Sequence, residues 1–184
     1  MYTGLIANRY AKALAAYAAA GGEERRTYDE VKRLIGCYRE DATLREALFS
    51  PVLSAEKKLG FVCRSFGGRP CAALGAFIRL VLRHHREHYL YFMLYSYRGL
   101  YKERHNIRDA VLQTAAPVGE EFVERLCRVA EARTHSEVHI RREVHPELVG
   151  GFVFRIDDVL IDASLAAQLK LLRRKLGSKP QRIV

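Results

Sequence analysis

The sequence lacks an apolar run long enough to cross a membrane. A membrane-spanning helix requires about 18 uninterrupted apolar residues, whereas the run Leu74–Leu82 is broken by Arg79 and the run Tyr89–Tyr97 contains Ser96. The N-terminus also lacks the basic and apolar regions of a secretion signal and the Arg- and Ser-rich composition of an organellar presequence. We therefore expect a protein that inserts no segment into a membrane.

Cysteine is scarce, and no Cys-x-x-Cys pair is present. Cys37, Cys63, Cys71 and Cys127 lie within apolar helical patterns, where free cysteine behaves as a small hydrophobic residue. We interpret all four as reduced thiols of a cytosolic protein. A disulfide between Cys63 and Cys71 is the less favoured alternative, because cytosolic compartments keep thiols reduced.

Motifs for nucleotide or serine chemistry are missing as well. Gly177-Ser178-Lys179 contains a glycine and a lysine, but no Gly-rich loop and no strand precede them. Asp162 and Ser164 resemble helix caps rather than catalytic groups, because no histidine is placed by the sequence to activate the serine. We expect this chain to have no catalytic site and to bind no ATP, no cofactor and no small-molecule substrate.

A histidine-rich segment, His84-His85-Arg86-Glu87-His88, resembles a metal-binding cluster. It departs from the zinc-protease pattern, in which glutamate directly follows the first histidine, and the neighbouring Arg83 and Arg86 would repel a cation. We interpret the segment as the solvated end of a helix and expect no metal. A metal-dependent hydrolase is the minor alternative, and it predicts bound zinc in the purified protein.

Composition permits a folded core but leaves function open. The chain is 49% hydrophobic and 28% charged, with a formal net charge of +10. Residues 1–105 contain 18 Lys and Arg against 10 Asp and Glu, while residues 106–184 contain 13 against 11. Such a charge attracts acidic partners in general, so a basic helical RNA-binding protein is the main alternative. The helical spacing of Tyr89, Tyr91, Tyr95, Tyr97 and Tyr101 suits packing better than base stacking, and we expect no nucleic-acid partner.

Residues 1–105 are patterned almost entirely as helices. Glycine pairs, Ser50-Pro51 and the capping residue Asp41 interrupt the apolar periodicity. The pattern predicts a compact six-helix bundle with helices near 3–20, 23–40, 42–49, 54–66, 70–86 and 87–105.

Residues 106–184 alternate short strands with helices and predict a small α/β domain. Alternating Phe152, Phe154 and Ile156, followed by Asp157-Asp158, predict a hairpin whose return strand is 159–161. Ser164 or Asp162 caps a terminal helix that ends near residue 176. The other expected elements are a strand at 110–114, a helix at 120–133 and a strand at 138–144.

Several segments together resemble the ATP synthase delta subunit family, whose mitochondrial relative is the oligomycin-sensitivity-conferring protein. They are ANRYAKAL at 7–14, LFSP at 48–51 followed by Lys57, TAAP at 114–117, HPELVGGFV at 145–153 and VLIDAS at 159–164. Their order spans essentially the whole chain. His145 stands where the family more often has aspartate before proline, so we expect no carboxylate role at this position.

The resemblance implies a non-catalytic stator subunit of a bacterial F-type ATP synthase. Domain 1–105 would bind the N-terminal segment of an alpha subunit on the catalytic head, and domain 106–184 would bind the C-terminus of the stalk b subunit. The chain would thereby resist rotor torque during proton-driven ATP synthesis. The complex would place it peripherally, on the cytoplasmic side of the inner membrane.

The first and fifth helices have apolar faces wider than one contact needs. A surface helix usually shows an apolar stripe a little over 100° wide, whereas the first helix spans roughly 150° at 100° per residue. Its outer face contains Ile6, Tyr10, Ala13 and Tyr17, and its inner face contains Ala7, Ala11, Leu14 and Ala18. In the fifth helix Ala73, Phe77, Leu80 and His84 lie beside Leu74, Ile78, Val81 and Leu82. We expect the residues that bind a partner helix to be Ile6, Tyr10, Ala13, Tyr17, Ala73, Phe77, Leu80 and His84.

Two such helices side by side would form a groove for an amphipathic partner helix, and the family uses its first and fifth helices in this way. The alternative is that both stripes are bundle core. Two interpretations of Gly150-Gly151 are open. The pair marks either the entrance of a strand, where a side chain would clash, or a turn that needs positive φ, and we favour the strand entrance.

Overall fold

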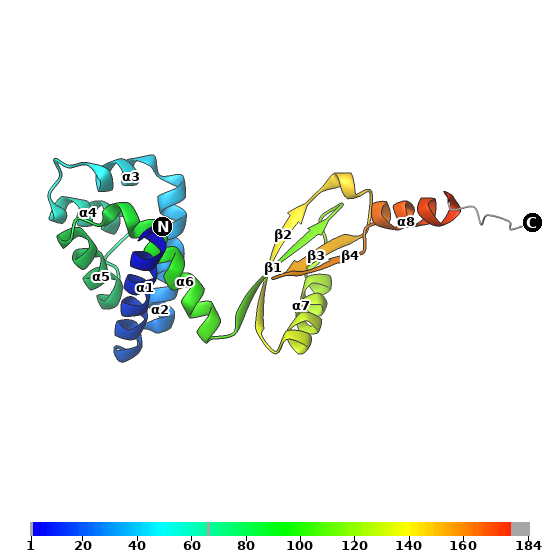
Figure 1. Cartoon of the computed structure of the whole chain (residues 1–184), viewed down its shortest axis with the longest axis horizontal. Coiled ribbons are helices and arrows are strands. Elements are labelled where there is room, and N and C mark those ends of the chain that lie inside the picture. Colours follow the sequence, from blue (N-terminus) through cyan, green and yellow to red (C-terminus); the bar gives the residue numbers. More distant parts are fainter. Residues whose placement is uncertain (1, 66, 178–184) are drawn as a thin grey trace, which may run out of the picture. The chain divides into compact units, whose positions relative to one another are not determined.

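The computed structural model describes residues 2–65 and 67–177. The chain divides into two compact units, Met1–His105 and Asn106–Val184 (Figure 1). The elements confirm the expected fold class, a helical bundle followed by a small α/β unit. Within the described residues, no helix is long and apolar enough to cross a membrane, and all four cysteines are free.

Six α-helices and one short 3-10 helix build the first unit (Figure 1). Its core is closely packed, because large side chains of α1, α2, α5 and α6 such as Leu14, Leu34, Ile78 and Leu94 are at most 2% exposed. The helices are α1 (Tyr2–Ala20), α2 (Glu24–Glu40), α3 (Ala42–Phe49), α4 (Ala55–Ser65), α5 (Ala72–Arg83), η1 (Glu87–Tyr89) and α6 (Leu90–Arg104).

The junction between α5 and α6 is the expected solvated helix end at His84, His85 and His88, which are exposed, but not at Glu87, which is buried. The helix stops at Arg83 because His85 takes a left-handed conformation with φ 53°. The backbone N–H of His85 then donates to Leu82 O (3.1 Å) and that of Arg86 to Val81 O (3.0 Å), the two hydrogen bonds of a Schellman motif.

Glu87 corrects that expectation directly. Its side chain is buried and forms an ion pair with the buried Lys58 of α4. The expectation failed because Lys58 is 29 residues away in the chain, and helical periodicity does not report such a partner.

Four strands, two α-helices and one short 3-10 helix build the described part of the second unit. The sheet order is β2-β1-β3-β4, with β1 and β2 parallel and the other neighbours antiparallel. The parallel pair is joined through α7, since parallel strands require a crossover connection. The bounds are β1 (Ile107–Thr114), α7 (Glu120–Thr134), β2 (Glu137–Val144), η2 (Pro146–Leu148), β3 (Phe152–Ile156), β4 (Val159–Asp162) and α8 (Leu165–Gly177).

The core of this unit lies between α7 and one face of the sheet. Ala130 of α7 is buried with Ala110, Leu112, Val138, Phe154 and Ile156 of the three strands β1, β2 and β3. The two-residue turn Asp157-Asp158 closes the expected hairpin, and Asp157 has φ 48°. Because β4 is exposed along its length, the core does not extend to that edge.

Candidate functional site

A groove lies between α1 and α5 in the helical unit. Its volume is about 380 Å³. Four of the eight residues expected to bind a partner line it, namely Tyr10, Ala13, Leu80 and His84. Arg9 and Arg86 complete the lining. The groove therefore occurs between the two helices that the sequence indicated.

The wide apolar stripe of α1 divides into two faces. Ala7, Ala11, Leu14 and Ala18 are at most 2% exposed and pack into the bundle. On the other face Ile6 and Tyr10 are half-buried, whereas Ala13 and Tyr17 are exposed. The outer face of α1 is thus open to a further contact, although Ile6 and Tyr17 do not line the groove itself.

The outer stripe of α5 reaches the surface only at the C-terminal end of the helix. Leu80 is 42% exposed and His84 is exposed, whereas Ala73 and Phe77 are 2% and 5% exposed. Phe77 meets the ring of Tyr10 edge-on, with centroids 6.3 Å apart. Phe77 therefore supports a groove residue from beneath, and Ala73 offers no surface to a partner.

Arg86 enters the groove through the turn that ends α5. Its Nη1 donates to the hydroxyl of Tyr10 (2.8 Å), and its guanidinium carbon lies 5.4 Å from the centre of the Tyr10 ring. Both contacts hold the cation at the edge of the groove, since a guanidinium is attracted to an aromatic face. No pattern in the sequence indicates this role, because it depends on the left-handed conformation of His85.

The lining combines an apolar floor with a basic rim. Tyr10, Ala13 and Leu80 provide apolar surface, and Arg9, His84 and Arg86 provide cationic or titratable groups. In the described part of the chain, these three side chains form no ion pair with a carboxylate. Such a surface suits an amphipathic helix with an apolar stripe beside acidic groups.

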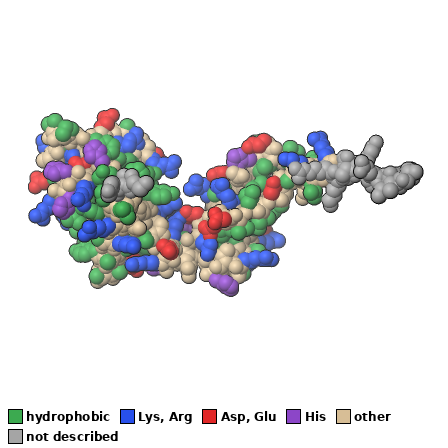
Figure 2. Space-filling view, in the orientation of Figure 1, with side chains coloured by type: hydrophobic (Ala, Val, Ile, Leu, Met, Phe, Trp, Pro, Cys, Tyr) green, Lys and Arg blue, Asp and Glu red, His purple; other side chains and the backbone are tan. Residues whose placement is uncertain are grey.

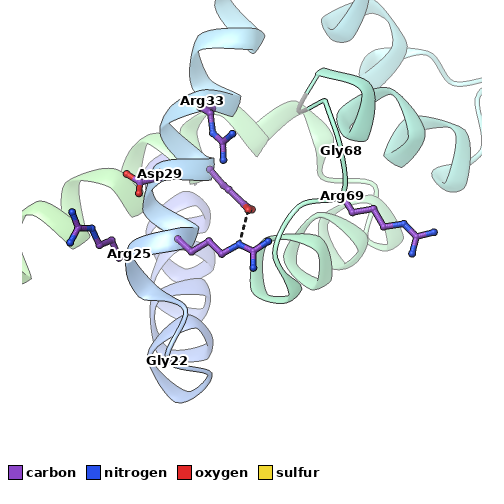
Figure 3. A pocket seen from close by; sticks show the side chains of 8 residues that line it. Gly22, Arg25, Asp29, Arg33, Gly68 and Arg69 are labelled. Carbon is purple, nitrogen blue, oxygen red and sulfur yellow. Dashed lines mark hydrogen bonds and ion pairs between the residues drawn. The ribbon is translucent and has the colours of Figure 1, made fainter.

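A second depression lies between α2 and the loop before α5. Its volume is about 590 Å³, and its lining includes Arg25, Arg26, Arg33 and Arg69. Arg26 Nε donates to Glu30 Oε1 (3.2 Å). Figure 3 shows Arg25 and Asp29 on one side of α2 and Arg69 on the opposite side of the view. The arginines therefore do not converge on one point.

Buried Glu30 gives this second depression a structural role. Its carboxylate accepts from Arg26 Nε (3.2 Å) and from the backbone N–H of Cys71 (2.7 Å). It thus ties α2 to the start of α5.

Figure 2 shows that basic side chains also lie among hydrophobic ones elsewhere on the visible face of the helical unit.

The motif glycines of the second unit lie against the start of α8. A Cβ on Gly150 would lie 2.6 Å from Leu165 Cδ1. Gly151 has φ +76°, and a Cβ there would collide with the carbonyl oxygen of Ala163. Gly151 thus combines the clash we favoured with the positive φ that we considered less favoured.

Asp162 and Ser164 satisfy backbone donors at the start of α8. Asp162 Oδ1 accepts from the N–H of Ser164 (2.9 Å), and Ser164 Oγ accepts from the N–H of Ala167 (3.2 Å). Hydrogen bonds from Ser164 lower the pKa of the Asp162 carboxyl below its usual value. Both residues act on the geometry of α8, in the way that capping residues do.

The edge of the second unit exposes many large apolar side chains. Leu165, Leu169 and Leu172 fall on one face of α8 at helical spacing, and they are 46%, 53% and 53% exposed. On β4, Val159 and Ile161 are also about half exposed, at 56% and 50%. We call these five residues the β4–α8 surface. Their exposure makes this segment the candidate contact surface of the second unit.

Comparison with known proteins identifies similar chains over the full length. The family model described as ATP synthase delta (OSCP) subunit matches residues 6–176. The ATP synthase subunit delta of Phocaeicola vulgatus is 40% identical over 100% of both chains. The subunit delta of Bacteroides fragilis is 38% identical, also over 100% of both chains.

A solved structure supports the fold. One chain of the Toxoplasma gondii mitochondrial ATP synthase hexamer, determined by cryo-EM, matches with a TM-score of 0.65 and 16% identity. The match covers 94% of this chain and 98% of that chain.

Among the described residues, no group of three or more His, Cys, Asp or Glu side chains is arranged to hold a metal ion. Ser178 and Lys179, which we considered for nucleotide binding, lie outside the described residues.

Proposed function

The chain belongs to the ATP synthase delta (OSCP) subunit family and is a peripheral-stalk component of F-type ATP synthase, and on this basis we propose that it joins the catalytic head to the stalk as a stator without an active site. The helical unit binds the head and the α/β unit binds the stalk. Its work is mechanical, because a stator must resist the torque of the rotor. The bacterial relatives support a place on the cytoplasmic side of the inner membrane.

The groove between α1 and α5 is the proposed site for the N-terminal segment of an alpha subunit. The observation that carries this proposal is the partly exposed Leu80 beside Tyr10 and Ala13, in a groove of about 380 Å³. A helix that buries its apolar stripe there would remove this surface from water, which is the main driving force of such docking.

The β4–α8 surface is the proposed site for the C-terminus of the b subunit. Its support is the exposed leucine stripe of α8, which is anchored at its start by the hydrogen bond from Leu165 N–H to Gly150 O (3.0 Å). A stripe of this kind at helical spacing suits packing against another helix. The two units would then contact different partners.

A pair of substitutions tests this division of labour. We expect Leu80→Asp to weaken binding of a peptide from the N-terminus of the alpha subunit by at least roughly 30-fold, because a carboxylate would be desolvated against an apolar helix. Leu169→Asp should leave that affinity unchanged and should weaken, by a similar factor, binding of a fragment from the C-terminus of the b protein. Isothermal titration calorimetry of the full-length variants measures both affinities.

Each variant is the matched control for the other, since both leucines are exposed to a similar degree, 42% and 53%. Melting followed by circular dichroism should show little change in either variant. If both proteins melt normally and Leu80→Asp binds the alpha peptide as tightly as the wild type, the groove is not the docking site.

The competing RNA-binding function makes a different prediction about salt. Binding to RNA would weaken steeply as salt rises, because it depends on release of counterions. Docking that rests on apolar contacts should weaken much less.

A pull-down from detergent-solubilised membranes is a second test. Recovery of alpha, beta and b subunits would support the stator function, and recovery of ribosomal components instead would refute it.

A further inference from the structure

We propose that the partner helix in the α1–α5 groove presents a carboxylate to Arg86, with Arg9 beside it, so that the groove selects an acidic amphipathic helix and not merely an apolar one. This inference rests on the proposed docking of the N-terminus of the alpha subunit. It adds the chemistry by which that segment is recognised.

The first argument is the fixed position of Arg86. Its Nη1 is held by the Tyr10 hydroxyl and its guanidinium lies over the Tyr10 ring. A guanidinium has five N–H donors in a planar fork, so donors remain after one is bonded to Tyr10. Because the Arg86 side chain is already held in place, it loses less conformational entropy when a carboxylate binds than a mobile arginine would.

The second argument is charge balance in the groove. Arg9 and Arg86 line it, and neither forms an ion pair with a carboxylate of the described residues. A docked helix would partly desolvate Arg86, which is already half-buried. Removing a cation from water without a counter-charge is unfavourable, so a helix that brings a carboxylate to this point binds more tightly than one that does not.

The other basic depression behaves differently and provides a comparison. There Arg26 is already paired within the chain, with Glu30. Arg25 lines that depression and is exposed. The depression and the groove have no lining residue in common. Replacing Arg25 therefore removes the same charge from the helical unit without touching the groove, which makes it a matched control.

The test is a double-mutant cycle on the full-length protein. The probe is a synthetic peptide of the N-terminal segment of the alpha subunit from the same organism, together with versions in which each Asp or Glu is replaced singly by Asn or Gln. The protein variants are Arg86→Gln, Arg86→Lys, Arg25→Gln and Leu80→Asp. Calorimetry gives the affinities at low and high salt, and circular dichroism confirms that each variant folds.

We expect Arg86→Gln to weaken binding roughly tenfold at low salt and to reduce the salt dependence, while Arg25→Gln has little effect. Arg86→Lys should retain part of the affinity, because it keeps the charge but loses the fork. One amide-substituted peptide should show the same loss with the wild-type protein and no further loss with Arg86→Gln.

Two results would overturn the inference. One is an Arg86→Gln variant that folds and binds as tightly as Arg25→Gln. The other is strict additivity between Arg86→Gln and every peptide substitution. After either of these results, the Leu80→Asp variant separates the two proposals. If Leu80→Asp abolishes binding, the groove is still the docking site and only the recognition of a carboxylate by Arg86 fails. If Leu80→Asp binds normally, the groove itself is the wrong site and both proposals fail.

Discussion

At the scale of single residues, the stability of the helical unit depends on the buried ion pair between Lys58 and Glu87. Their side chains are 7% and 8% exposed. We expect Lys58→Met to destabilise the protein by about 3–5 kcal/mol, because it leaves a buried carboxylate without its counter-charge. Urea unfolding followed by circular dichroism measures this loss.

The control is the double variant Lys58→Met with Glu87→Leu, which removes both charges. It should recover most of the lost stability, since replacing a whole buried pair by apolar groups is often nearly neutral. Equal destabilisation of the single and double variants would show that packing, and not the unpaired charge, causes the effect.

The same pair predicts how stability depends on pH. Burial would raise the pKa of Glu87, but the hydrogen bond and charge of Lys58 outweigh it, and the pKa lies below its usual value of 4.5. The unfolded chain therefore binds a proton at a higher pH than the folded chain does. The stabilisation is present above about pH 4.5 and is lost as the pH falls below it.

Urea unfolding of the wild type and of the Lys58→Met, Glu87→Leu double variant at about pH 3 to 7 tests this dependence. The double variant should lose less stability on acidification than the wild type. Parallel curves for the two proteins would contradict the assignment to Glu87.

Arg86 marks the limit of inference from residues alone. In the sequence it is a charge that would repel a metal ion, whereas the structure places it in the groove against Tyr10. The reason is conformational. His85 adopts φ 53° without being glycine, and a turn of this kind is usually signalled by glycine at that position.

At the scale of elements, α8 depends on its first turn. Ser164 is 2% exposed and its hydroxyl accepts from the N–H of Ala167. Ser164→Ala should destabilise α8 by about 0.5–2 kcal/mol, the usual cost of losing such a cap. Hydrogen exchange of the α8 amides should become faster, while exchange in α1–α6 stays the same.

Ser164→Asp is the conservative control, because aspartate also caps helices well. It should leave the exchange of the α8 amides as it is in the wild type. Unchanged α8 exchange in Ser164→Ala would mean that Gly150 and Leu165 hold the helix start without the cap.

The helices and strands themselves followed closely from sequence patterns, because apolar periodicity and turn residues act locally. The two-residue turn Asp157-Asp158 and the strands on either side lie where they were expected. β1 begins at Ile107, before the expected residue 110. Its first residues include Arg108 and Asp109, whose charges hide a strand that is completed by pairing with β2.

At the scale of the whole molecule, the division after His105 predicts two folding units. Each has its own buried core, so residues 1–105 expressed alone should unfold in one cooperative transition near its temperature in the full chain. Calorimetry of the fragment and the full-length protein measures this. A fragment without a cooperative transition would show that the helical unit needs the second unit to fold.

The sequence by itself determined the number and order of the α-helices and β-strands, the change from helices to an α/β unit, and the family motifs at 7–14 and 145–153, because these features depend on neighbouring residues. The tertiary structure alone decided which outer-face residues meet. It buried Ala73 and Phe77, left Leu80 exposed, and paired Lys58 with Glu87. The physical reason is that a helical wheel gives the direction of a side chain, whereas burial and charge pairing depend on which distant segment packs against it.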